Sequence, residues 1–229
     1  MLYCGLKKDG KKQFLRNGKE YERFYEHIGL FPLVIVSPYD NELIRGGSEE
    51  RRRFADMIIS QIDRPYLEVL MAYNRTLKQR NALLKNMAES GRSDDETLMI
   101  YNQQLTGSGN DIFRKRNDFI SRFIPLFSDI YNTLSLGRET VGVEYQSDLH
   151  ENDFAALLAE ARIRDLSCGY STTGVHRDDL EFKINGLPAR QAGSQGQQGR
   201  NSQSNTNSPP RCVRWASTRQ TVLWSGPHF

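Results

Sequence analysis

The feature that most constrains the fold is a stretch of helical periodicity that begins at Glu49 and continues to about Ser135. Apolar side chains recur there mostly at multiples of three and four residues, which places them on one face of a helix. The pattern predicts long amphipathic helices. The first apolar face consists of Leu67, Leu70, Leu77 and Leu84, and we expect Arg75, Lys78, Arg80 and Lys85 on the other faces.

A start signal precedes this stretch. Ser37-Pro38 ends an apolar run, because proline fixes φ and disfavours helical geometry in the residue before it. Gly46-Gly47-Ser48 then opens the helix, and Ser48 is the expected N-cap. Glu49 and Glu50 fall in the first turn, where acidic groups suit the positive end of the helix dipole.

The helical stretch divides into several helices. A polar insert over 89–96 separates the first long helix from a short one around 98–105, and another helix is expected over about 110–134. Long antiparallel helices with short connections form compact helical units. We therefore expect residues 49–136 to form a helical arm domain.

The segments on either side of the arm have strand patterns. Residues 1–36 contain the turn dipeptides Asp9-Gly10 and Asn17-Gly18, and Leu33-Val34-Ile35-Val36 has the composition of a short buried strand. After Gly137 the period changes to two. The later segment should contain a strand with Val141, Val143 and Tyr145 on one face, a helix from an Asn152 cap to about Leu166, a loop over 173–179, a strand over 180–184 and a turn at Asn185-Gly186. A helix would be expected to start near Ser194, but no convincing helical pattern begins there.

One N-terminal motif imitates a phosphate-binding loop. The run from Gly5 to Lys12 reads GLKKDGKK, but a P-loop needs serine or threonine at its last position, where the hydroxyl binds magnesium. Only a few residues precede Gly5, and no helical pattern follows Lys12. We interpret the run as a hairpin.

Composition describes a mildly basic protein, and its length suits one large domain or two ordinary ones. The 229 residues are 38% hydrophobic and 26% charged, with a net charge of +3, and this charge by itself does not indicate nucleic-acid binding. The cysteines Cys4, Cys168 and Cys212 have no spacing typical of zinc sites or disulfide frameworks, which agrees with a reducing cytoplasm. No apolar run approaches the roughly 20 residues of a membrane span.

Several short blocks, in this order and spacing, resemble the RecF family of bacterial recombination and gap-repair ATPases of the ABC/SMC type. The resemblance covers roughly residues 3 to 198. The blocks are Ile44-Arg45-Gly46-Gly47-Ser48, Glu50-Arg51-Arg52-Arg53-Phe54, Tyr66-Leu67, Tyr73-Asn74-Arg75, Leu77-Lys78-Gln79-Arg80-Asn81, Gly169-Tyr170, Thr173-Gly174-Val175-His176-Arg177-Asp178-Asp179-Leu180 and Gly193-Ser194-Gln195-Gly196-Gln197-Gln198.

The resemblance implies an α/β fold in which part of an ABC-type ATPase lobe, with mixed strands at both ends of the chain, surrounds an inserted α-helical arm. On this basis residues 1–48 are a strand-rich part of the lobe, 49–136 the arm, and 137–198 a return to the lobe with the signature motif. Residues 199–229, rich in Ser, Asn, Pro and Arg without any period, are interpreted as an aberrant or disordered tail.

The resemblance also assigns an ATP-binding role in trans. Ser194, Gln195, Gly196 and Gln197 match the family's signature, which completes the ATP site of the opposite subunit at a helix N-terminus. The family's Walker A segment would lie upstream of Met1 and its Walker B segment downstream of Gln198. We therefore interpret the chain as a truncated or frame-shifted form, and we assign it no catalytic residue. We expect that it does not hydrolyse ATP alone and that it binds neither ATP nor magnesium tightly.

The densest polar cluster is His176, Arg177, Asp178 and Asp179. A metal or acid/base site is one interpretation, but only one histidine is present and adjacent acids point opposite ways in an extended chain. The other interpretation, which we favour, is a hydrogen-bonded loop that braces the signature segment. The family has proline where this chain has Val175, which changes the turn.

Six basic residues are candidates for contacts to DNA phosphates, which give affinity without sequence readout. The alternative is a solvated helix face, on which Glu49, Glu50 and Asp56 pair with some of these residues. The candidates are Arg51, Arg52, Arg53, Arg75, Lys78 and Arg80.

The resemblance implies the function of the intact family. Its members are cytoplasmic proteins of DNA replication, recombination and repair that bind single-stranded and duplex DNA with ATP and magnesium, dimerise through the nucleotide, act with RecO and RecR at gaps and support the SOS response. An alternative from another class is a non-enzymatic helical protein-interaction module. Salt dependence distinguishes the two, because phosphate binding weakens steeply with salt.

Overall fold

The computed structural model describes the chain except residues 7–9, 11, 22, 31–41 and 192–229. All described elements belong to one compact unit, Met1–Gly193. In chain order the elements are β1 (Leu2–Leu6), β2 (Lys12–Arg16), β3 (Lys19–Glu20), the 3-10 helix η1 (Phe24–His27), α1 (Glu42–Arg45), α2 (Ser48–Ile62), α3 (Arg64–Ser90), α4 (Asp95–Ser135), β4 (Val141–Gln146), the 3-10 helix η3 (Asp148–His150), α5 (Phe154–Glu160), α6 (Arg162–Cys168), β5 (Asp179–Ile184) and β6 (Leu187–Pro188).

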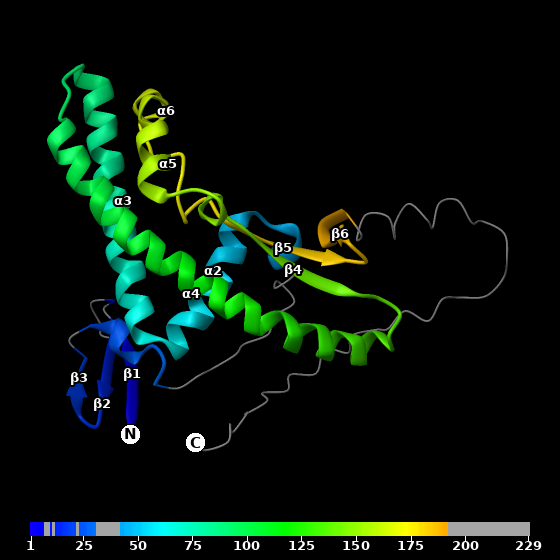
Figure 1. Ribbon diagram of the computed structural model, residues 1–229. Helices are drawn as coiled ribbons and strands as arrows, with labels where there is room; N and C mark the ends of the chain where they lie inside the picture. Colours follow the sequence, from blue (N-terminus) through cyan, green and yellow to red (C-terminus); the bar gives the residue numbers. More distant parts are fainter. Residues whose placement is uncertain (7–9, 11, 22, 31–41, 192–229) are drawn as a thin grey trace. The chain divides into compact units, whose positions relative to one another are not determined.

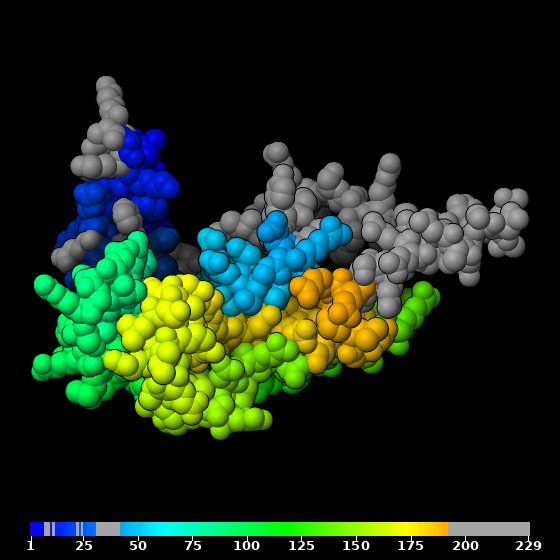
Figure 2. Space-filling model, turned by 90° about the horizontal axis from the view of Figure 1, so that it is seen from above, coloured from blue at the N-terminus to red at the C-terminus, as the bar shows by residue number. Residues whose placement is uncertain are grey.

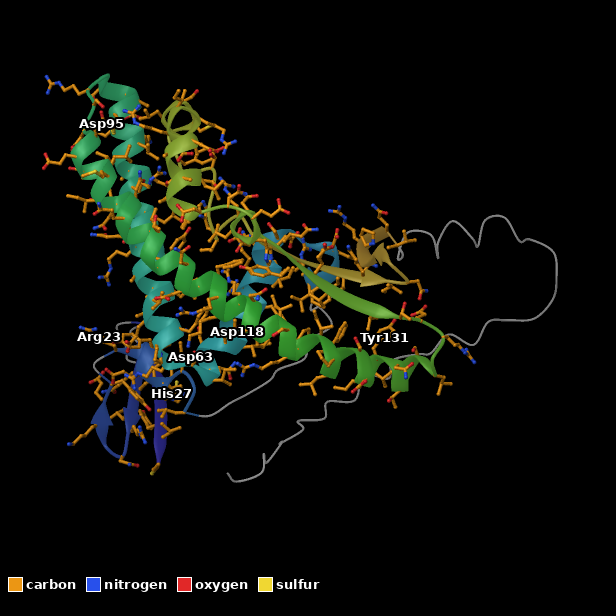
Figure 3. All side chains as sticks on the ribbon, viewed as in Figure 1. Arg23, His27, Asp63, Asp95, Asp118 and Tyr131 are labelled. Atoms are coloured by element: carbon orange, nitrogen blue, oxygen red, sulfur yellow. The ribbon has the colours of Figure 1, made fainter. Side chains whose placement is uncertain are left out.

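The helical arm consists of α2, α3 and α4, and local signals set its corners. Asp63 ends α2 and caps α3, where its carboxylate accepts a hydrogen bond from the backbone N–H of Tyr66. Asp63 lies at the bend between the two helices (Figure 3). At the other end of α3, Gly91 adopts φ +67°, and Asp94 then caps α4.

The predicted break between helices at 105–110 is wrong. Helix α4 runs without interruption from Asp95 to Ser135, passing first along α3 and then along β4 (Figure 1). Gly109 lies within this helix, and the position requires glycine because a side chain there would collide with the ring of Phe154. Tertiary packing therefore favours a glycine at this position of the helix, although the helix propensity of glycine is low.

The N-terminal strands form an antiparallel sheet in the order β1-β2-β3. Leu6 pairs with Lys12, so the motif that imitates a phosphate-binding loop is confirmed as a hairpin. Asn17 and Gly18 both have positive φ, as the predicted turn between β2 and β3 requires. Not all of this segment is strand, since Phe24–His27 forms a 3-10 helix. The strand predicted over 33–36 lies outside the described residues.

The second sheet is antiparallel in the order β4-β5-β6. The strand predicted after Gly137 is confirmed, and its residues Val143 and Tyr145 are buried together with Leu180 of β5. The predicted turn at Asn185-Gly186 also forms, with both residues at positive φ. Ile120 of α4 belongs to the same apolar cluster, so the end of the arm packs on this sheet.

Three predictions at helix ends need correction. Gly47 rather than Ser48 is the N-cap of α2, and no side chain caps it. Asp153 rather than Asn152 caps the helix after β4, because its carboxylate accepts from the N–H of Ala156. That helix is not continuous to Leu166 but divides into α5 and α6 at Ala161.

The main core lies where α3, α4 and α5 meet. Phe154 of α5 is fully buried, and Gly109 and Gly174 allow their backbones to approach its ring. In Figure 2 the yellow surface of α5 and α6 adjoins the green ends of α3 and α4, and the light-blue α1 and start of α2 lie beside the orange β6. The buried apolar residues of this core are Ile59, Tyr66, Tyr73, Leu105, Ile112, Leu149, Phe154, Leu158 and Val175.

A buried ionic junction between the arm and strand β5

The start of β5 is bound to α2 by a two-pronged ion pair. Arg51 donates from its Nε and one Nη to the two carboxylate oxygens of Asp179, at 2.6 and 2.8 Å. Its other Nη donates to the carbonyl of Gly46 at 2.8 Å. Burial alone would raise the pKa of Asp179, but the hydrogen bonds from Arg51 outweigh it and lower that pKa. Arg51 is therefore a structural tie between two elements far apart in sequence.

Arg52 joins the same junction through the backbone. Its guanidinium donates to the carbonyl oxygen of Asp178. Burial lowers the pKa of Arg52, and the positive charge of nearby Arg116 acts in the same direction. Consecutive arginines of α2 thus hold consecutive residues at the start of β5.

Arg116 of α4 lies at the centre of the junction, with only 3% of its side chain exposed. It binds both carboxylate oxygens of Asp56 at 2.9 and 3.0 Å, and donates to the carbonyl of Val175 at 2.7 Å and to Asp178 at 3.2 Å. Burial opposes its charge, but the carboxylate of Asp56 outweighs burial and raises the pKa of Arg116. The hydroxyl of Tyr145 donates to Asp178 at 2.5 Å. Asp178 is buried deeply enough that its pKa is nevertheless raised.

A second buried arginine, Arg80 of α3, anchors the loop before β5. It is fully buried, and it donates to Asp165 of α6 at 2.7 Å, to the hydroxyl of Ser171 at 2.6 Å and to Asn102 of α4 at 2.8 Å. Its other terminal nitrogen, Nη2, has no hydrogen-bond partner among the described residues. The same loop is held at Thr172, whose N–H donates to Asp165 at 2.8 Å.

His176 is held on both ring nitrogens. Nδ1 lies 2.8 Å from the hydroxyl of Tyr73, and Nε2 lies 3.1 Å from the carbonyl oxygen of Ser171. Burial lowers the pKa of His176 to about 4, so the ring is neutral at physiological pH. The neighbouring Arg177 is exposed, and its guanidinium lies over the ring of Tyr170. Among the described residues, no group of three or more His, Cys, Asp or Glu is placed to hold a metal ion.

An open groove of about 980 Å³ lies next to the junction. Its lining comes from α2, from α3, from the loop over 170–177, from residues 27–29 and from Arg116 of α4. Arg53 and Asn74 reach it from the two helices, and Arg177 reaches it from the loop.

The six basic candidates separate into two groups. Arg51, Arg52 and Arg80 are engaged in the contacts described above. Arg53, Arg75 and Lys78 are exposed. The prediction that Arg80 lies away from the apolar face of its helix is wrong, because its side chain is fully buried. The signature residues Ser194, Gln195, Gly196 and Gln197 lie outside the described residues.

Sequence reasoning missed Arg116, although a signal was present. Arg116 falls four residues after Ile112 and four before Ile120, which places it in the middle of an apolar face. Arg80 has the same property, since it lies between Leu77 and Leu84 on the face of α3. A single arginine inside an apolar stripe requires a buried acidic partner, and here the partners are Asp56 with Asp178, and Asp165.

The fold defines a class: a mixed α/β protein in which two small antiparallel sheets adjoin a large helical part. The chain matches no protein-family model. It is 46% identical over 196 residues to the DNA replication and repair protein RecF of Bacteroides fragilis. This alignment covers 86% of this chain and 52% of that protein. The RecF protein of Flavobacterium johnsoniae is 46% identical over 197 residues, covering 86% of this chain and 55% of the relative.

Solved structures agree with the sequence relatives. Two structures of the recombination mediator protein RecF in the RecFOR pathway, one with ATP and one with ATPrS, match with a TM-score of 0.77 and 31% identity, over 86% of this chain and 55% of theirs. The chain is thus similar to RecF proteins over most of its own length, and it spans about half the length of the curated relatives that it matches. No helix in the described part of the chain has the length and apolar character needed to cross a membrane.

Proposed function

We propose that this chain supplies the helical arm and adjoining lobe segments of a RecF-type protein that acts in DNA replication, recombination and repair. The observation that carries the proposal is the 46% identity to RecF over 86% of the chain. The whole protein would bind single-stranded and duplex DNA with ATP and magnesium, dimerise through the nucleotide, and work in the cytoplasm with RecO and RecR at gaps and in the SOS response. Ser194, Gln195, Gly196 and Gln197 would complete the ATP site of the opposite subunit.

For this chain, the proposal assigns DNA contact to the exposed candidates Arg53, Arg75 and Lys78. Their charges are accessible to phosphates, whereas Arg51 and Arg52 hold the start of β5. Contacts of this kind release counterions and weaken as salt rises. They bind unrelated sequences equally, because phosphates carry no base information.

DNA binding, rather than ATP hydrolysis, is the useful measurement, since the 229-residue sequence contains no complete phosphate-binding loop. The test variant combines Arg53→Gln, Arg75→Gln and Lys78→Gln. Fluorescence anisotropy should show weaker binding to unrelated duplexes by the same factor. The slope of log K against log salt should shrink by roughly 0.9 for each lost contact on B-form DNA.

A matched control removes exposed arginines elsewhere, at Arg122, Arg138 and Arg190. Both variants remove equal formal charge, so a general loss of attraction would affect them equally. If the control loses as much affinity and as much salt dependence as the test variant, the assignment to Arg53, Arg75 and Lys78 is wrong. Substitution of Arg51 or Arg52 is unsuitable, because it would disturb the junction with β5.

A further inference from the structure

The groove beside the junction has a net positive lining. Among the described lining residues there are four arginines and two carboxylates, which leaves an excess of two positive charges from these groups. Arg116 and Asp56 neutralise each other through their two-pronged ion pair. The remaining charges are those of Arg52, Arg53 and Arg177 against the single carboxylate of Glu49. An occupant of this groove should therefore be acidic.

The groove lining also contains exposed apolar side chains, which a purely electrostatic site would not need. Met57 is 54% exposed and Tyr170 is 45% exposed, and both line the groove. Leu70 contributes further apolar lining from α3. When a partner covers exposed apolar side chains inside a groove, their burial stabilises the complex.

A free carboxamide adds a third kind of contact. Asn74 is exposed and lines the groove, and its side chain makes no hydrogen bond to the described residues. A carboxamide offers both a donor and an acceptor, which matches the N–H and C=O of one peptide unit. Asn74 lines the groove from α3, together with charged residues of α2 and the loop that carries Tyr170 and Arg177.

We infer that this groove binds a segment of a protein partner in which acidic side chains flank an apolar one. Arg53 and Arg177 would pair with the carboxylates, Met57 and Tyr170 would cover the apolar side chain, and Asn74 would bond to the backbone. This surface shares Arg53 with the proposed DNA contacts, whereas the other two DNA candidates, Arg75 and Lys78, do not line the groove.

A protein segment suits the groove better than a nucleic acid strand does. Single-strand binding uses successive aromatic platforms along a basic track. Tyr170 is the one exposed tyrosine, phenylalanine or tryptophan in the described lining, and Arg177 already lies over its ring at 5.4 Å. Arg52 is turned toward the carbonyl of Asp178. The lining therefore lacks both the repeated stacking surfaces and the dense charge of a strand-binding track.

The test uses the full chain and a fluorescently labelled synthetic peptide in which pairs of glutamates alternate with leucines. The comparison peptide has glutamine in place of every glutamate. Anisotropy should show binding of the glutamate peptide and at least about tenfold weaker binding of the glutamine peptide, since charge-assisted contacts are lost. Arg177→Gln should weaken binding of the glutamate peptide by about tenfold, whereas Arg75→Gln should leave it unchanged.

A charge series at Asn74 keeps the inference testable even if one variant folds poorly. Because Asn74 is exposed, both Asn74→Asp and Asn74→Lys should retain the native circular dichroism. Asn74→Asp should weaken binding of the glutamate peptide, and Asn74→Lys should strengthen it. Equal affinity for both peptides, or no response to the charge at position 74, would overturn the inference.

A single-stranded oligonucleotide distinguishes the other class of ligand. If Arg177→Gln and the Asn74 series change its affinity while the glutamate peptide does not bind, the groove is a nucleic-acid site and the inference is wrong. Because Arg75 and Lys78 lie outside the groove lining, a double variant with Arg75→Gln and Lys78→Gln tests DNA binding independently of this result. The inference and the proposed function can therefore fail separately.

Discussion

The two halves of α4 have the same helical pattern and opposite surroundings. In the half that contains Ile112 and Arg116, both an apolar and a charged side chain are buried. In the outer half, Leu126, Ile130 and Leu134 recur every four residues and remain 64%, 63% and 72% exposed. The comparison teaches that periodicity identifies which residues share a face, whereas only packing decides whether that face is covered.

The outer half is not wholly exposed. Its opposite face packs on the second sheet, where Phe123 and Phe127 stack at 5.4 Å and Phe127 contacts the ring of Phe182 edge-on. The stripe of Leu126, Ile130 and Leu134 is therefore a second apolar face on the same turns. Stability should depend strongly on the buried half and weakly on this stripe.

The largest expected effect is loss of the buried arginine. Arg116→Ala leaves Asp56 and Asp178 in place without their cation, which typically costs about 3–5 kcal/mol when a buried pair is broken. Urea unfolding should show this as a large shift of the midpoint. Arg116→Lys should lose less, because it keeps the charge but not the two-pronged geometry.

The matched control for Arg116 is Arg114→Ala, two residues away on the same helix. Arg114 pairs with Asp111 while 66% exposed, and exposed pairs contribute little. Its midpoint should stay near that of the unaltered protein. Equal midpoints for the Arg116 and Arg114 variants would contradict the central role of the junction.

The next effect is a pH dependence from His176. In the folded protein its pKa is about 4, below the ordinary 6.5, because burial disfavours the charged ring. Between these values the unfolded chain binds a proton that the folded protein does not. This contribution to stability is therefore present above pH 6.5 and lost as pH falls toward 4, by roughly 3 kcal/mol in total.

Comparison with His176→Gln isolates this contribution. The variant also loses a hydrogen bond to Tyr73, so the slope of unfolding free energy against pH is the readout rather than its absolute value. Asp178 has a raised pKa and acts with the opposite sign, but it is present in both proteins. Parallel slopes between pH 6.5 and 4 would rule out the assignment to His176.

The smallest effect on stability should come from the exposed stripe. Changing Leu126, Ile130 and Leu134 together to glutamine should alter the unfolding free energy by only about 0.5 kcal/mol per site, as is usual for surface positions. Self-association measured by sedimentation should fall, because an exposed apolar patch is removed. Ile112→Ala, in the buried half, should instead cost about 2–5 kcal/mol. Similar losses at both sites would contradict the difference between the two halves.

Much of the local structure follows from patterns in the chain. The arm helices, the turns at Asn17-Gly18 and Asn185-Gly186, and the strand after Gly137 were all predictable, because each depends on residues near one another in sequence. The matched blocks also predicted the similarity to RecF proteins. The junction was only partly predictable. The arginine at position 116 inside an apolar stripe indicates a buried ion pair, but it does not identify the acidic residue that pairs with it.

The partners were decided by the tertiary structure alone. Arg51 meets Asp179 across 128 residues, and Arg80 meets Asp165 across 85. No local preference selects such pairs, since they form only when α2, α4 and β5, or α3 and α6, pack together. The continuity of α4 has the same origin, because contact with Phe154 requires the glycine at position 109 that local propensity alone would place at a helix break.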